Sequence, residues 1–114
     1  MNAGSFFIND EQDWQDVEPG IQRKIVAHTP DLMAVCVKFD LGAVGTPHQH
    51  EIHDQIGYVV QGAFEVELEG EKRRLGPGDA FVAPHHTLHG AVALESESVV
   101  IDLFSPRRDD MLTP

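Results

Sequence analysis

The chain has 114 residues, 41% hydrophobic and 24% charged, which fits one domain with one apolar core. Its 19 acidic and 8 basic residues give a formal net charge of -11, so it repels phosphate backbones and anionic lipid surfaces. Neither nucleic acid nor a membrane is expected as a partner.

The N-terminal residues carry no sign of a targeting segment. Residues 1–8 contain no basic residue, and their longest apolar run is Phe6, Phe7 and Ile8, which is too short for the core of a signal peptide. No segment of the chain approaches the length of a membrane-spanning helix. The sequence therefore predicts a cytoplasmic protein. Residues 10–17 are predicted to form one helical turn.

Period-2 alternation predicts strands along the rest of the chain. It is clearest in residues 32–39 and 64–69, where an apolar residue stands at every second position. Residues 21–27, 55–60 and 99–104 are further strand candidates. Turn-forming residues separate these runs: Asp40, Gly42, Gly62, Gly70, residues 76–79 and Pro84. Short strands that are each followed by a turn are typical of an all-β sandwich or barrel.

The histidines gather in two places, around residues 48–53 and 85–89. In an extended segment His48 and His50 lie on the same face, because side chains alternate with period 2. Gln55 offers a carbonyl oxygen at the start of the next strand, and His89 comes from a separate hairpin. Three neutral nitrogens and one neutral oxygen suit one divalent ion such as Ni, Zn, Fe or Mn. The alternative is that these are solvated surface histidines.

The two clusters lie within longer patterns that resemble the two motifs of the cupin family. Residues 45–62 resemble the first motif, in which a glycine precedes His-x-His, an acid follows and a glycine closes the turn. Residues 78–89 resemble the second motif, which supplies the last metal ligand. The resemblance implies a double-stranded β-helix, the cupin jelly-roll barrel, as a single domain over residues 1–114. Two positions depart from the family pattern: Gln55 replaces the usual Glu, and His86 replaces a glycine.

The neutral side chain at position 55 has a consequence for the bound ion. Three His and one Glu would leave a divalent ion with a net charge near +1, whereas three His and Gln55 leave the full +2. Such an ion is the stronger Lewis acid and binds an anionic ligand better. It is less suited to oxygen chemistry. Gln55 therefore favours capture of a carboxylate or an enolate over a dioxygenase reaction.

The chain as a whole resembles the KdgF family of pectin degradation proteins. The segments that carry the resemblance are residues 25–30, 48–58, 83–86 and 102–108. The family opens the ring of 4,5-unsaturated monouronates, released from pectin or alginate, to give 5-keto-4-deoxyuronate. The resemblance implies that activity here, with a small unsaturated uronate as substrate and a place in carbohydrate catabolism.

Three residues near the C-terminus are candidates for the chemistry. Asp102 stands among apolar neighbours, and we expect a buried carboxylate that transfers protons, the alternative being an exposed position on the outer sheet face. Arg108, or else Arg107, is expected to bind the substrate carboxylate. The alternative for the two arginines is a solvated ion-pair cluster with the aspartates that follow. Phe104 shares the parity of Asp102 and forms either a pocket wall or plain core.

The sequence leaves two alternative functions open, and it also suggests an oligomeric state. The rivals are another metal-dependent cupin enzyme, a dioxygenase or isomerase, and a non-catalytic sugar-binding module. His53, His85 and His86 are secondary candidates for the site. A homodimer that pairs through an edge strand is expected, with Phe6, Phe7 and Ile8 as candidate contacts.

Overall fold

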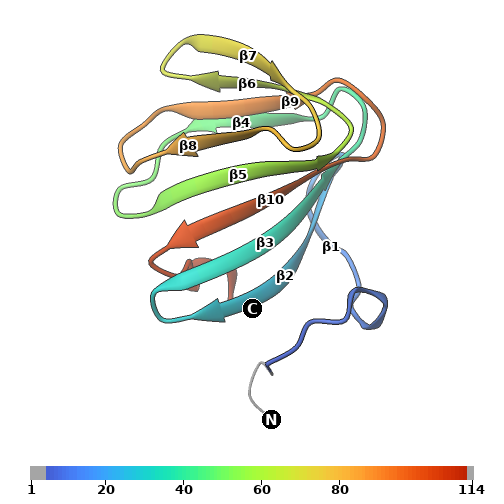
Figure 1. Cartoon of the computed structure of the whole chain (residues 1–114), viewed down its shortest axis with the longest axis vertical. Coiled ribbons are helices and arrows are strands. Elements are labelled where there is room, and N and C mark those ends of the chain that lie inside the picture. Colours follow the sequence, from blue (N-terminus) through green and yellow to red (C-terminus); the bar gives the residue numbers. More distant parts are fainter. Residues whose placement is uncertain (1–4, 113–114) are drawn as a thin grey trace.

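In the computed structural model, which describes residues 5–112, ten strands form two antiparallel sheets that face each other (Figure 1). The six-stranded sheet has the order β1-β2-β3-β10-β5-β8, and the four-stranded sheet has the order β4-β9-β6-β7. In chain order the strands are β1 (Gln15–Glu18), β2 (Ile21–Thr29), β3 (Leu32–Phe39), β4 (Val44–His48), β5 (Asp54–Gln61), β6 (Phe64–Leu68), β7 (Glu71–Leu75), β8 (Ala80–Ala83), β9 (His89–Ala93) and β10 (Ser98–Ser105). The predicted all-β double-stranded β-helix is confirmed.

The core lies between the two sheets and follows from the alternation in the strands. In β6, Phe64 and Val66 are buried while the glutamates between and after them are partly exposed. The Phe64 ring meets Phe39 of β3 edge to face, with ring centroids 5.1 Å apart. Burial of an aromatic or aliphatic side chain of this size stabilises the fold by roughly 1.5–3 kcal/mol. Met33, Val35 and Phe104 form a second buried cluster.

The predicted helical turn over residues 10–17 is wrong over most of its length. A short 3-10 turn, η1 (Asn9–Glu11), is present, but the chain then enters β1, which pairs with β2. All four β1 residues are exposed, so no apolar pattern marks the strand and only its backbone pairing defines it. A second 3-10 turn, η2 (Asp109–Met111), follows β10. No helix among residues 5–112 is long and apolar enough to cross a membrane.

One end of the barrel brings distant loops together. β4 ends at His48 and β9 begins at His89, and these two residues are direct cross-strand partners. The loop after β4 and the loop before β9 therefore lie at the same end. The backbone N–H of His86 donates to the carbonyl of His50 across these loops, at 2.7 Å. We refer to this end as the mouth.

Candidate metal centre and active site

Three imidazoles and one amide converge at the mouth from both sheets. One nitrogen from each of His48, His50 and His89 lies within 4.8 Å of the others. Gln55, on β5 of the opposite sheet, directs Oε1 to within 3.1 Å of His50 Nε2 and 3.0 Å of His89 Nε2. His48 is exposed, whereas Gln55 and His89 are buried. The four side chains predicted as ligands are thus brought together.

Backbone carbonyls fix the tautomer of two of these imidazoles. His48 donates through Nδ1 to the Thr46 carbonyl, and His89 donates through Nδ1 to the Thr87 carbonyl, both at 2.9 Å. A carbonyl only accepts, so in each neutral ring the proton is on Nδ1 and the Nε2 lone pair is free. A backbone acceptor on the second nitrogen is the usual companion of a metal-binding histidine.

Burial favours the neutral, metal-binding form of His50 and of His89. It lowers the pKa of His50 to about 4, helped by the positive charge of Arg108, and it also lowers the pKa of His89. Near pH 7 the His89 Nε2 lone pair therefore faces Gln55 Oε1 at 3.0 Å with no proton between them. A divalent cation satisfies such a set of acceptors, so the residues present fit a borderline transition metal.

Asp102 enters the same space from the six-stranded sheet. It lies on the inner face of β10, between the buried Val100 and Phe104. Its cross-strand neighbour on β5 is Gly57, where a Cβ atom would collide with the ring of Phe81. The missing side chain at Gly57 thus leaves room for the Phe81 ring beside the carboxylate.

The surroundings of Asp102 make its carboxylate easier to protonate than an exposed one. Burial raises the pKa of Asp102 to about 6, although a hydrogen bond from Gln55 and the charge of Arg108 both act to lower it. A carboxyl group with a pKa near neutrality can both accept and release a proton.

A small cavity extends inward from these groups. Its volume is about 90 Å³, and its polar lining residues are His48, Gln55, His89 and Asp102. The remaining walls are apolar or glycine: Val37, Phe39, Gly45, Val59, Phe64, Val66, Phe81, Gly90, Ala91 and Val100.

Arg108 and Phe104 form one side of the mouth. Phe104 is buried in the cluster with Met33 and Val35, and its ring centroid lies 5.7 Å from that of His50. The Arg108 guanidinium lies over the Phe104 ring, 5.0 Å from its centroid. Phe104 is therefore part of the core and a neighbour of His50, but it is not among the residues that line the cavity.

The predicted alternative for the two arginines, ion pairing with the aspartates that follow, is also observed. Arg107 Nε donates to Asp109 at 2.7 Å. Arg108 donates to Asp110 through Nε at 3.0 Å and Nη2 at 2.8 Å. The structure thus brings Arg108, and not Arg107, into contact with Phe104 while its guanidinium is paired.

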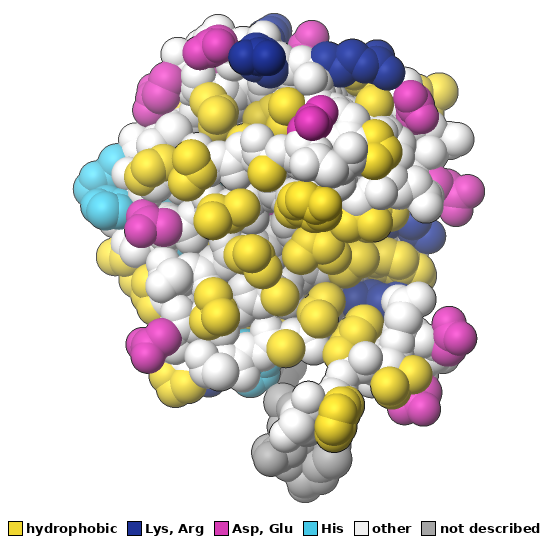
Figure 2. Space-filling model, in the orientation of Figure 1, with side chains coloured by type: hydrophobic (Ala, Val, Ile, Leu, Met, Phe, Trp, Pro, Cys, Tyr) yellow, Lys and Arg dark blue, Asp and Glu magenta, His cyan; other side chains and the backbone are white. Residues whose placement is uncertain are grey.

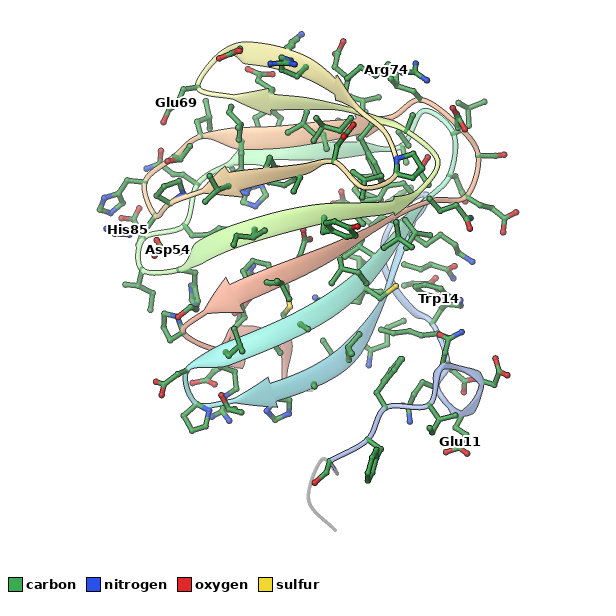
Figure 3. The ribbon with its side chains drawn as sticks, in the orientation of Figure 1. Glu11, Trp14, Asp54, Glu69, Arg74 and His85 are labelled. Carbon is green, nitrogen blue, oxygen red and sulfur yellow. The ribbon has the colours of Figure 1, made fainter. Side chains whose placement is uncertain are left out.

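Two histidine–carboxylate pairs join the mouth loops, and sequence reasoning missed both pairs. Asp54 accepts hydrogen bonds from the backbone N–H and from Nδ1 of His85, each at 2.9 Å, and Figure 3 shows the two side chains together at the mouth. His86 Nε2 lies 3.0 Å from a Glu51 carboxylate oxygen. The available signal was one acid beside each of two predicted ligands, His50 and Gln55.

Comparison with known proteins places residues 35–104 in the cupin domain family. The pectin degradation protein KdgF of Dickeya dadantii is 56% identical over 107 residues, which cover 94% of this chain and 97% of that protein. The solved structure of KdgF from a Halomonas species is 92% identical, with a TM-score of 0.94 over 95% of this chain and 98% of that one. An RmlC-like cupin from Shewanella frigidimarina is 38% identical, with a TM-score of 0.90 over 95% of this chain and 96% of that one.

Proposed function

The chain belongs to the cupin family, and from that premise we propose that it is an enzyme that opens the ring of 4,5-unsaturated monouronates to give 5-keto-4-deoxyuronate. The observation that carries the proposal is the likeness, over nearly the whole chain, to a pectin degradation protein and to a solved KdgF structure. The sources of the substrate would be pectin and alginate. The cupin fold alone would not support this choice, because one fold hosts many functions.

The reaction needs one proton to move and no net proton change. The substrate is a cyclic hemiacetal whose C4=C5 double bond is conjugated to a carboxylate. Loss of the proton from the C1 hydroxyl forms the C1 carbonyl and breaks the bond between C1 and the ring oxygen. The ring oxygen then becomes the enolate oxygen on C5. When C4 takes up a proton, C5 becomes a ketone and the linear product is complete.

We assign the proton transfer to Asp102. Its carboxylate would accept the proton of the C1 hydroxyl and return it to C4, ending in its starting state. Its inward position on β10 and a pKa of about 6 support this role, because a catalytic base works best with a pKa close to the working pH. The cavity walls around it are mostly apolar, which disfavours water that would compete for the proton.

We assign the metal-binding role to His48, His50, Gln55 and His89. When bound by them, one divalent transition metal ion, with Ni, Zn, Fe and Mn as candidates, would supply positive charge for the oxygen that becomes an enolate. The Gln55 amide adds no negative charge to this set, so the full charge remains available to an anionic substrate.

We assign the substrate carboxylate to Arg108, with Phe104 as the wall against which the sugar lies. An arginine fork matches a carboxylate in geometry and charge. Arg108 lies over Phe104, which neighbours His50, so a uronate whose carboxylate pairs with Arg108 would reach from the mouth toward the cavity.

One experiment tests the proposed function directly. Lyase-generated unsaturated monouronate is mixed with the metal-replete protein, and the ultraviolet absorbance of the conjugated alkene is followed while NMR identifies the product. We expect faster loss of absorbance than in buffer, with a linear keto product, and a return to the spontaneous rate after chelation. A metal-replete protein that leaves the spontaneous rate unchanged rules out the function. Oxygen consumption without uronate would instead indicate the oxygenase alternative.

We further propose that the enzyme acts in the cytoplasm as a homodimer. The outer face of the six-stranded sheet exposes apolar side chains, and Figure 2 shows hydrophobic groups spread across this face with acidic groups mainly at its edge. Four of them lie on the neighbouring strands β5 and β8: Ile56, Tyr58 and Val60 of β5 and Val82 of β8. Two copies that each carry a charge of -11 repel least where acidic side chains are few. Phe6 and Ile8, also exposed, could extend the contact.

A further inference from the structure

Asp110, which the proposed mechanism does not use, holds the arginine that the mechanism assigns to the substrate. We infer that Asp110 is a positioning residue that fixes the plane and direction of the Arg108 guanidinium for a uronate carboxylate. This inference rests on the proposed function, because it deepens the role given there to Arg108. It concerns how tightly an acidic sugar binds and leaves the proton transfer at Asp102 unchanged.

The contact between the two side chains is bidentate. Asp110 Oδ1 accepts from Arg108 Nε at 3.0 Å, and Asp110 Oδ2 accepts from Nη2 at 2.8 Å. A guanidinium presents five N–H donors on a rigid plane, so a carboxylate on the Nε side leaves donors of Nη1 and Nη2 for a second carboxylate. Two parallel bonds also set the orientation of that plane, which one bond does not.

A second contact, with an aromatic ring, holds the flat face of the Arg108 guanidinium. Its guanidinium lies over the Phe104 ring at 5.0 Å, and that ring is itself immobilised in the core against Met33 and Val35. Phe104 faces His50 of the candidate metal centre. Asp110 thus contacts Arg108, Arg108 contacts Phe104, and Phe104 contacts His50 of the candidate metal centre. Only 18% of the Arg108 side chain is exposed. A long flexible side chain is held by a carboxylate at its edge and an aromatic ring at its face.

The neighbouring pair provides a natural comparison. Arg107 and Asp109 have the same spacing in sequence, but their contact is a single bond from Nε at 2.7 Å. The Arg107 side chain is 30% exposed, and among residues 5–112 no aromatic ring is stacked on its guanidinium. Its backbone carbonyl lies 3.2 Å from His53 Nε2. Asp109 therefore offers the matched control, with the same charge in the same 3-10 turn.

The test compares Asp110→Asn, Asp110→Glu and Asp109→Asn with the parent as full-length, metal-loaded proteins. Binding of D-galacturonate and of uncharged D-galactose is measured by NMR titration, and kcat and KM are measured with unsaturated monouronate. For Asp110→Asn we expect the galacturonate Kd and the KM to rise about three- to tenfold, with kcat within about twofold. Galactose binding should not change. Asp110→Glu should restore most of the affinity, because it keeps the charge and both oxygens. Asp109→Asn should match the parent.

The outcomes separate this inference from the proposed function. If Asp110→Asn binds galacturonate as tightly as the parent or more tightly, Asp110 does not position Arg108 and the inference is wrong. Equal weakening by Asp109→Asn would also overturn it, since the effect would then be general to the acidic turn. If the parent has no turnover, the proposed function fails, yet the galacturonate titrations still decide the role of Asp110. Equal thermal midpoints for all variants exclude misfolding as the cause.

Discussion

The side chain at position 55 determines how much net positive charge a bound divalent ion would keep. Its Oε1 lies about equally far from the Nε2 atoms of His50 and His89, and the amide adds no charge beside these two imidazoles. Gln55→Glu should bind a divalent ion at least as tightly as the parent, because an anionic oxygen replaces a neutral one. Turnover should fall roughly tenfold or more, because the net charge available to the enolate falls by one. Metal content and kcat of the same preparation test this, and undiminished turnover would contradict it.

Asp102 should carry protons without holding the metal. Asp102→Asn keeps the shape of the side chain but cannot exchange a proton. General acid–base catalysis typically contributes about 100- to 10,000-fold, so turnover should fall by about that factor. The metal content should stay at the level of the parent. Loss of metal from the Asn variant would make Asp102 a ligand or a support for one, and turnover close to that of the parent would make it a bystander.

The same substitution should stabilise the metal-free fold at high pH. The folded-state pKa of Asp102 is about 6, above its ordinary value of 3.8, so ionisation costs stability as the pH rises through that interval. One pKa unit corresponds to about 1.4 kcal/mol, which makes the full cost on the order of 2–3 kcal/mol. Metal-free Asp102→Asn should therefore unfold at a higher temperature than the metal-free parent at pH 8. At pH 4 the two midpoints should converge. If the variant and the parent differ in unfolding temperature by the same amount at pH 8 and pH 4, ionisation of the Asp102 carboxylate is not the cause of the difference.

The loop before β9 forms part of the mouth, and contacts on two sides hold it in place. On one side His85 binds Asp54 and His86 binds Glu51, both from the segment that carries His50 and Gln55. On the other side the loop is tied to the turn between β6 and β7. There the Leu88 backbone N–H donates to the Glu69 carboxylate at 3.0 Å. The loop immediately precedes His89, so these contacts bear on the placement of that imidazole.

Removal of one of these contacts should weaken metal binding. Asp54→Ala removes the acceptor for both the backbone N–H and Nδ1 of His85. We expect the apparent affinity for a divalent ion to fall roughly tenfold, in line with the loss of other groups that orient ligands. Turnover per bound ion should stay close to that of the parent. Asp10→Ala, which removes an equal charge from exposed η1, is the control. Equal ion affinities of Asp54→Ala and the parent would show that the loop is placed by other contacts.

Strands that alternate or that contain a continuous apolar run could be predicted from sequence, and strands with neither pattern could not. β3 and β6 alternate clearly because one side of each packs in the core. β7 has the sequence Glu-Lys-Arg-Arg-Leu at the edge of its sheet, with four of five residues exposed, so no alternation marks it. β9 carries small residues and a glycine, which give a weak pattern although the strand is partly or fully buried.

The same limit applies to the candidate site. The histidines and Gln55 stand out because their spacing follows recognisable motifs, and Asp102 stands out because it interrupts an apolar strand. Asp110 gave no such signal, and Glu51 was marked only by its place after His50. Acidic residues are frequent in this chain, and their partners are set by how loops fold at the mouth. Tertiary placement, which no local pattern encodes, decides which of many carboxylates meets an arginine or a histidine.

At the scale of the whole molecule, the outer face of the six-stranded sheet should mediate the proposed homodimer. Tyr58→Glu places like charges opposite each other across a two-fold contact and should yield monomers. Val44→Glu makes a similar change on the four-stranded sheet, at a residue that is 48% exposed compared with 47% for Tyr58, and should leave the dimer intact. Light scattering during gel filtration measures both, against a chain mass of 12.6 kDa. A parent that elutes as a monomer at micromolar concentration would refute the dimer.

The position of β10 has a consequence for how the protein is made. This strand is the last of the ten strands in residues 5–112, yet it lies inside the six-stranded sheet, hydrogen-bonded to β3 on one side and β5 on the other. During synthesis β3 and β5 therefore emerge long before the strand that joins them, and both expose unpaired edges until it arrives. Asp102, Phe104 and Arg108 all come with or just after that strand. The nascent chain can thus form neither its continuous sheet nor its complete site until β10 has emerged.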